Sequence, residues 1–180
     1  MVHIEMSVAG NWPGGIEYWQ SFAETSCRAA IAHTPFARLI DCAADLEISV
    51  QLANDEAVQD MNSTLRGKDK PTNILSFPML DTQTLHNLAA SDMVPDVPEI
   101  LCGDMILAHA VCVREATNKQ ISLTHHFQHL VVHGTLHLLG YDHENDVEAD
   151  IMENLEITIL AAMGVANPYD LQDAAAEHVI

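Results

Sequence analysis

The stretch HGTLHLLGYDH, residues 133–143, limits the possible folds of this chain most strongly. It places His133 and His137 four residues apart, a spacing that puts both rings on one face of a helix. Gly140 can adopt the left-handed conformation that ends a helix, which allows His143 to turn back towards the pair. The stretch therefore predicts a helix that ends at a cluster of three histidines.

Three histidines in this arrangement predict a site for one zinc ion per chain. Three imidazole ligands leave the fourth tetrahedral position open for water, which is typical of catalytic rather than structural zinc. Nickel and cobalt also accept three imidazoles, so the spacing does not select the metal. The chain has 11 histidines, and a single pair at this spacing would be weak support. The third histidine after the glycine makes the metal interpretation specific.

A zinc peptidase of the H-E-x-x-H type carries a glutamate directly after the first histidine, where it activates the bound water. Here that position is Gly134, which has no side chain to act as a base, so peptide hydrolysis is disfavoured. Two neighbouring residues keep alternative interpretations. His129 either supports a ligand, faces a substrate or is an ordinary core or surface residue. Asp142 either orients a ring, accepts a proton or shapes the turn.

The charge distribution indicates where an anionic substrate would bind. The formal net charge of −19 argues against non-specific binding to nucleic acid. Three of only seven basic residues, Arg66, Lys68 and Lys70, nevertheless lie within five positions. Arg66 is the strongest candidate for contact with phosphoryl oxygens, because a planar guanidinium can bind two of them. For the two lysines, an ordinary surface role remains an alternative.

The hydrophobic pattern predicts one α+β domain, a small mixed four-stranded sheet with helices packed on it. Asp104, after a glycine in the last strand, is expected to be structural, and residues 79–98 are expected to form a long loop. The domain is expected to span residues 1–169, with 170–180 a flexible tail. Strands are expected at 3–9, 45–53, 74–78 and 100–108, and helices at 16–33, 55–65, 109–119, 123–139 and 145–163.

Several features predict a cytoplasmic protein with no membrane partner. No apolar run is long enough to cross a bilayer, and the first residues, MVHIEMSVAG, lack the pattern of a secretory signal. The four cysteines show no paired spacing, so we expect reduced thiols, mostly in the core.

Four separated blocks occur in an order that is specific to one family. They are MNSTLRGKDKPTNILSFP (61–78), GDMILA (103–108), HLVVHGTLHLLGYDH (129–143) and NDVEADIMENLEITILAAMGVANPY (145–169). Together they resemble the YbeY endoribonucleases, which are bacterial rRNA maturation factors. The resemblance covers roughly residues 44–169 and implies a metalloprotease-like scaffold. It also implies the site residues: His133, His137 and His143 as metal ligands, with Arg66 beside the metal.

The resemblance further implies a metal-dependent endoribonuclease specific for single strands, acting in 3′-end maturation of small-subunit (16S) rRNA and in ribosome quality control. The implied partners are the rRNA precursor, proteins of the small subunit and a GTPase of ribosome assembly. An alternative is a non-catalytic assembly factor that docks on the small subunit with a structural zinc. The strong negative charge favours that alternative, because it suits basic ribosomal proteins. The family usually has aspartate where this chain has Asn73, so one charge-assisted hydrogen bond is expected to be weaker.

Overall fold

A mixed four-stranded sheet forms the base of the domain, in a computed structural model that describes residues 1–41, 44–90 and 98–170. The strand order is β1-β2-β4-β3. Strands β1, β2 and β4 run parallel, whereas β3 is antiparallel to β4, so the predicted mixed sheet is confirmed. The strands are β1 (Val2–Val8), β2 (Asp45–Ala53), β3 (Ile74–Pro78) and β4 (Glu99–Ala108).

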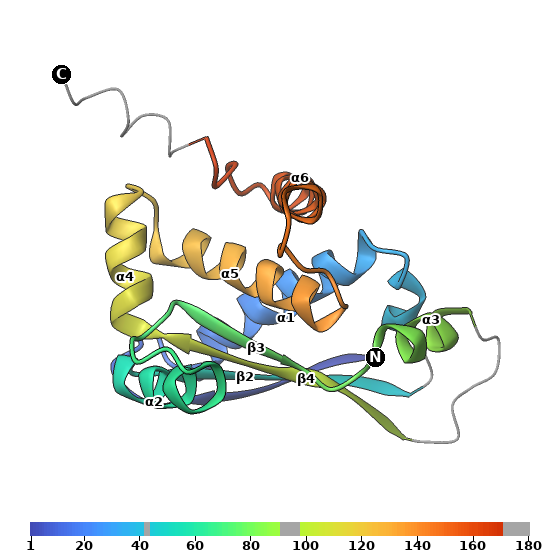
Figure 1. Cartoon of the computed structure of the whole chain (residues 1–180), viewed down its shortest axis with the longest axis horizontal. Helices are drawn as coiled ribbons and strands as arrows, with labels where there is room; N and C mark the ends of the chain where they lie inside the picture. The colour runs from blue at the N-terminus through green and yellow to red at the C-terminus, as the bar shows by residue number, and fades with distance from the viewer. Residues whose placement is uncertain (42–43, 91–97, 171–180) are drawn as a thin grey trace.

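Helices cover both faces of this sheet (Figure 1). Helix α1 (Ile16–Ala32) and helix α5 (Leu123–Leu138) pack on each other and on one face. Helix α2 (Asp55–Arg66) packs on the other face through Val58, which lies in a cluster with Leu75 and Ile106. The remaining helices are α3 (Thr82–Ala90), α4 (His109–Asn118), α6 (Asp146–Ala162) and the short 3-10 helix η1 (Ala37–Asp41).

The alternating pattern that predicts β2 follows directly from burial. Every second side chain of the strand points into the core beneath α1 and α5, and the intervening ones as far as Gln51 are half-buried or exposed. The core-facing residues are Leu46, Ile48, Val50 and Leu52. Because β2 lies between two parallel partners, it fixes the sheet on which α5 rests.

Helix α5 is almost completely enclosed, which holds its histidines in fixed positions. Its N-terminus is capped by Ser122, whose hydroxyl accepts a hydrogen bond from the His125 backbone N–H at 3.0 Å. Phe127 and Val131 lie in the main core, and Leu136 packs in a second cluster with residues of α6. An enclosed helix of this kind presents side chains at its C-terminal end with little freedom to move.

The prediction of a continuous loop over residues 79–98 is wrong, because residues 82–90 form α3. Asp81 caps this helix: its carboxylate accepts hydrogen bonds from the Thr84 backbone N–H at 2.7 Å and from the Thr84 hydroxyl at 3.1 Å. Leu85 and Ala89, four residues apart, are both buried. This short apolar pair is a helical signal that the prolines later in the segment obscure. Residues 91–97 lie outside the described part of the chain.

The described cysteines confirm the expectation of core thiols. Cys27, Cys102 and Cys112 are buried and not bonded to one another. Burial raises the pKa of Cys27 and of Cys102 to about 12, so both remain protonated and unreactive at neutral pH. Among the described residues, no helix has the length and apolar character needed to cross a membrane. The expected tail at 170–180 falls outside the described residues beyond position 170.

Candidate metal centre

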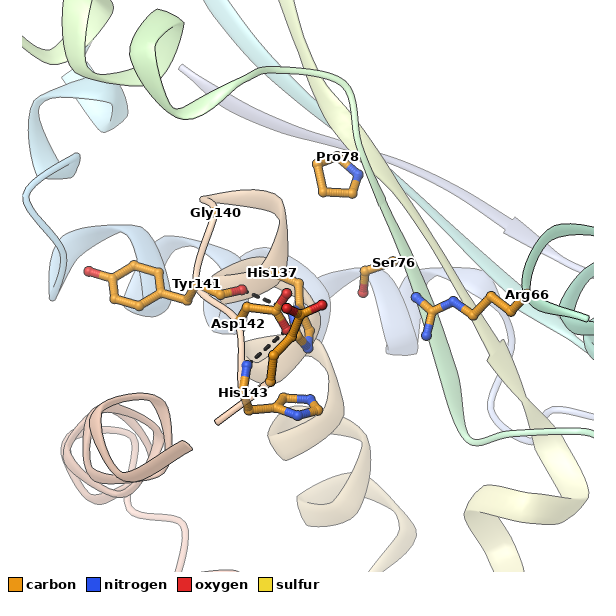
Figure 2. A pocket seen from close by; sticks show the side chains of 9 residues that line it. Arg66, Ser76, Pro78, His137, Gly140, Tyr141, Asp142 and His143 are labelled. Carbon is orange, nitrogen blue, oxygen red and sulfur yellow. Dashed lines mark hydrogen bonds between the residues drawn. The ribbon is translucent and has the colours of Figure 1, made fainter. Parts of the chain in front are cut away.

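The three predicted ligands meet at the C-terminal end of α5. His133 and His137 occupy successive turns of this helix, and their Nε2 atoms lie 3.1 Å apart. The chain then turns at Gly140, whose φ of 85° lies in the left-handed region that glycine allows. This turn brings His143 back, so that one ring nitrogen from each histidine lies within 4.8 Å of the others. Figure 2 shows two of the three, His137 and His143. The predicted clustering of the three histidines is therefore present.

The hydrogen bonds of the two helical rings show that this cluster fits a metal ion. His137 Nδ1 lies 2.9 Å from the Tyr141 carbonyl oxygen, and His133 Nδ1 lies 2.8 Å from Glu156 Oε1. Both oxygens only accept hydrogen bonds at neutral pH, so both Nδ1 atoms must donate. In the neutral rings the Nε2 atoms then carry lone pairs, and two lone pairs 3.1 Å apart repel unless a cation lies near both.

The environment of His137 favours the neutral form that metals require. Burial, together with the charges of His133 and His143, lowers the pKa of His137 to about 4. At neutral pH this ring therefore need not lose a proton before it binds a metal.

Arg66 is the last residue of α2, and the loop after it is tightly held. Gly67 ends the helix in the left-handed conformation with a φ of 66°, and the Lys68 N–H donates to the Asn62 carbonyl at 3.2 Å. The buried Asn62 side chain donates in turn to the Lys70 carbonyl at 2.7 Å. This local bonding fixes the direction in which the helix end presents Arg66.

Arg66 and two of the predicted ligands share one cavity of about 430 Å³. In Figure 2 the guanidinium points past Ser76 towards His137 and His143. Neither Lys68 nor Lys70 lines this cavity, so Arg66 is the member of this group of three basic residues that does so. The full lining comprises Arg66, Ser76, Pro78, His137, Gly140, Tyr141, Asp142, His143 and Glu144.

The position at which a zinc peptidase has its glutamate is closed by packing. A β-carbon on Gly134 would overlap Met105 Sδ and lie 2.8 Å from Ile74 Cδ1 and 3.0 Å from Ser76 Oγ. A side chain at this position would therefore force the side chains of Met105, Ile74 and Ser76 to move. In this packing the position of the peptidase base faces the sheet, and the sequence supplies no side chain there.

Sequence reasoning missed Glu156, a carboxylate that lies directly behind the cluster. Its side chain is fully buried and accepts hydrogen bonds from His129 Nε2 at 2.9 Å, His133 Nδ1 at 2.8 Å and the Tyr169 hydroxyl at 2.6 Å. Burial alone would raise the pKa of Glu156, but the hydrogen bonds from both histidines lower it to about 2. The sequence does contain a signal for this residue: Glu156 lies at the four-residue spacing of the apolar, buried face of α6, between Met152 and Leu160.

Two residues with open interpretations, and a third that was expected to be structural, now have defined places. His129 lies against Glu156, behind the cluster, and not on the cavity that contains Arg66. The carboxylate of Asp142 accepts a hydrogen bond from the His143 backbone N–H at 2.8 Å, which shapes the turn before the third ligand. Asp104 lies in β4, where an irregularity in the pairing with β2 coincides with Gly103 and its φ of 152°.

Asn73 also has an identifiable role in this chain. Its Oδ1 accepts a hydrogen bond from the Ile74 N–H at 2.7 Å, and its Nδ2 donates to Glu115 Oε2 at 3.0 Å. The same Glu115 oxygen accepts from His126 Nε2 at 2.8 Å. An amide is thus suited to this position, because it can both accept from the backbone and donate to a carboxylate.

The fold and the site define a single mixed-sheet domain in which three clustered histidines could hold a metal ion, two of them in a cavity that an arginine also lines. A family model described as Endoribonuclease YbeY matches residues 18–164. A protein named Endoribonuclease YbeY from Sphingopyxis alaskensis is 47% identical over 173 residues, 96% of this chain and 100% of that protein. A second, from Rhizorhabdus wittichii, is 43% identical over 173 residues, 96% of this chain and 99% of that protein. This chain belongs to the YbeY family.

A solved structure is also similar in outline. The solution structure of a protein from Thermotoga maritima aligns with a TM-score of 0.47 at 19% identity, covering 88% of this chain and 91% of that one.

Proposed function

We propose that the protein is a metal-dependent endoribonuclease that cleaves single-stranded RNA, with the 3′ end of precursor 16S rRNA as its main substrate and ribosome quality control as a second task. The observation that carries the proposal is the position of Arg66, which lies in the same cavity as His137 and His143 although it comes from a different element. The relatives named Endoribonuclease YbeY support the reaction class. Such work would take place in the cytoplasm, where ribosomes are assembled.

His133, His137 and His143 would hold the metal, for which we propose one zinc ion. When bound, zinc supplies Lewis acidity and a water molecule that is acidic enough to react near neutral pH. Arg66 would bind the phosphoryl oxygens of the scissile phosphodiester and stabilise the negative charge that develops on them. It would also offset locally the repulsion between RNA and a chain of net charge −19.

The test is the substitution Arg66→Ala, assayed on single-stranded RNA. We expect the cleavage rate to fall by about 10²-fold or more, since removing one preformed charge-stabilising group typically has this effect. Zinc content and melting temperature should not change, because Arg66 is exposed. Arg114→Ala is the matched control, because Arg114 is an exposed arginine on α4 that does not line the cavity. Undiminished cleavage by Arg66→Ala would contradict the assignment.

A second candidate function is a non-catalytic assembly factor that docks on the small subunit with a structural zinc. The charge distribution favours it, because no lysine or arginine follows Lys119 whereas α6 and its flanks are rich in carboxylates. Proteins of the small subunit and an assembly GTPase would then be the partners. Both functions can coexist in one protein. Cosedimentation with small subunits that is retained in Arg66→Ala, without cleavage by the wild type, would favour docking alone.

A further inference from the structure

Glu156 is the one buried carboxylate among the described residues that contacts a candidate metal ligand. We infer that Glu156 is a positioning residue for the metal centre: it fixes the ring of His133 so that Nε2 faces the ion, and it is itself held by Tyr169 and His129. This inference rests on the proposed metal site. It adds that the affinity of this site for zinc depends on the contact between Glu156 and His133.

The hydrogen bonds divide the two carboxylate oxygens between two tasks. Oε1 accepts from His133 Nδ1 at 2.8 Å. Oε2 accepts both from His129 Nε2 at 2.9 Å and from the Tyr169 hydroxyl at 2.6 Å. Two donors on Oε2 fix the plane of the carboxylate, and this leaves Oε1 aimed at His133.

The contact with His133 has two consequences for metal binding. A carboxylate can only accept, so the ring proton resides on Nδ1 and the lone pair of Nε2 faces His137. A negative partner at Nδ1 also makes the imidazole a stronger donor to the metal. His137 has only a neutral partner at the same position, the carbonyl of Tyr141. The charged support is therefore specific to His133.

Tyr169 brings the end of the described chain to the metal centre. The residues after α6 turn back along α5, and the ring of Tyr169 packs edge-on against His129 at a centroid distance of 5.8 Å. Tyr169, Glu156, His133 and His143 all line a second cavity of about 140 Å³. His133 and His143 therefore have an opening away from Arg66, and Tyr169 covers part of it.

Stability alone does not account for a buried carboxylate at this position. Removing an ionised group from water is costly, and replacing buried ionic groups by apolar ones is often neutral or stabilising. The rest of the buried face of α6 is mainly apolar, with Met152, Ile159 and Leu160. A role in holding His133 explains why a carboxylate interrupts the apolar buried face of α6 at the point where it meets His133.

The experiment measures zinc affinity by competition with a chromophoric chelator, together with the melting temperature of each variant with and without zinc. We expect Glu156→Gln, which keeps the shape and removes the charge, to weaken zinc binding about 10- to 100-fold. The rise in melting temperature on adding zinc should shrink in parallel. Glu148→Gln is the matched control, an exposed glutamate on the same helix that lines neither cavity, and should stay within about twofold of the wild type.

A purely structural role would give a different result. Glu156→Gln would then lower the melting temperature of the metal-free protein and leave the zinc affinity unchanged, which would overturn the inference. If Glu156→Gln does not fold, Tyr169→Phe decides, since it removes one donor from Oε2 at the edge of the domain. We expect it to weaken zinc binding by several-fold, and an unchanged affinity would overturn the inference.

The outcome also separates this inference from the proposed function. Wild-type protein that binds zinc tightly, loses this affinity on Glu156→Gln and cleaves no RNA would support the positioning role and refute the nuclease. Wild-type protein that cleaves RNA in a zinc-dependent way, with unchanged zinc affinity in Glu156→Gln, would refute the positioning role alone.

Discussion

Gly134 packs against Met105 so closely that a β-carbon at this position would overlap the methionine sulfur. This contact brings α5 down onto β4 between the two turns that carry His133 and His137. A glutamate here would force the neighbouring side chains of the sheet to repack or the helix to shift. The close packing therefore places two candidate metal ligands on a rigid support and leaves little room for a side chain at the position of the peptidase base.

Substitution of Gly134 by alanine should destabilise the protein. The three side chains around the missing β-carbon are all buried, so the helix or its neighbours must shift. Overpacking of this kind typically costs about 1–3 kcal/mol in the free energy of unfolding. Urea unfolding measures the loss. His125→Ala, on the exposed side of the same helix, serves as the control, and equal stability of the two variants would contradict this account.

Loss of one ligand should abolish tight zinc binding while loss of a neighbouring histidine should not. His143→Ala removes the exposed member of the cluster and leaves the core intact, so the fold should survive. We expect substoichiometric zinc after gel filtration and little rise in melting temperature when zinc is added. His125→Ala should retain one zinc per chain. Elemental analysis distinguishes the two, and full zinc content in His143→Ala would exclude it as a ligand.

The metal-free protein should become less stable as the pH falls from about 6.5 to about 4, in part because of His137. Its pKa in the folded chain is lowered from 6.5 to about 4, mainly by burial. In this interval the unfolded chain binds a proton that the folded chain does not, so protonation favours unfolding. His137→Gln removes this contribution and should flatten the dependence of melting temperature on pH. Identical slopes for both proteins would contradict the lowered pKa.

Replacing Asn73 by aspartate, the residue that the family resemblance leads us to expect there, should destabilise this particular chain. Asn73→Asp would place a second carboxylate where the amide now donates to Glu115 at 3.0 Å. We expect a loss of about 1–3 kcal/mol at neutral pH, since a hydrogen bond is replaced by repulsion between like charges.

A double-mutant cycle provides the check. Glu115→Gln should restore much of the stability of Asn73→Asp, because the added amide can donate to the new carboxylate. Strictly additive effects of the two substitutions would show that the residues do not interact.

Local signals in the sequence were sufficient for most of the fold. Alternation identified β2, and a capping asparagine identified the start of α2, where the Asn54 side chain accepts from the Ala57 N–H at 3.0 Å. Helix α3 was missed because its buried face is short and prolines follow it.

The metal ligands were predictable because all three lie within eleven residues, on a helix end and its turn. The contact between Glu156 and His133 joins two helices, and no periodic pattern specifies which faces of two helices meet. For Arg66, the clustering of basic residues predicted an anion-binding site. Its position beside the histidines was expected only from the family resemblance, because residues so far apart in the sequence meet only in the tertiary structure.

Zinc-dependent cleavage of single-stranded RNA tests the central claim most directly. The wild-type protein and His137→Ala would be stripped of metal by chelation, assayed, and assayed again after one equivalent of zinc is added. The account predicts that chelation abolishes cleavage, that zinc restores it in the wild type, and that His137→Ala remains inactive under both conditions. Cleavage that persists in the chelated wild type, or that His137→Ala retains, would contradict it.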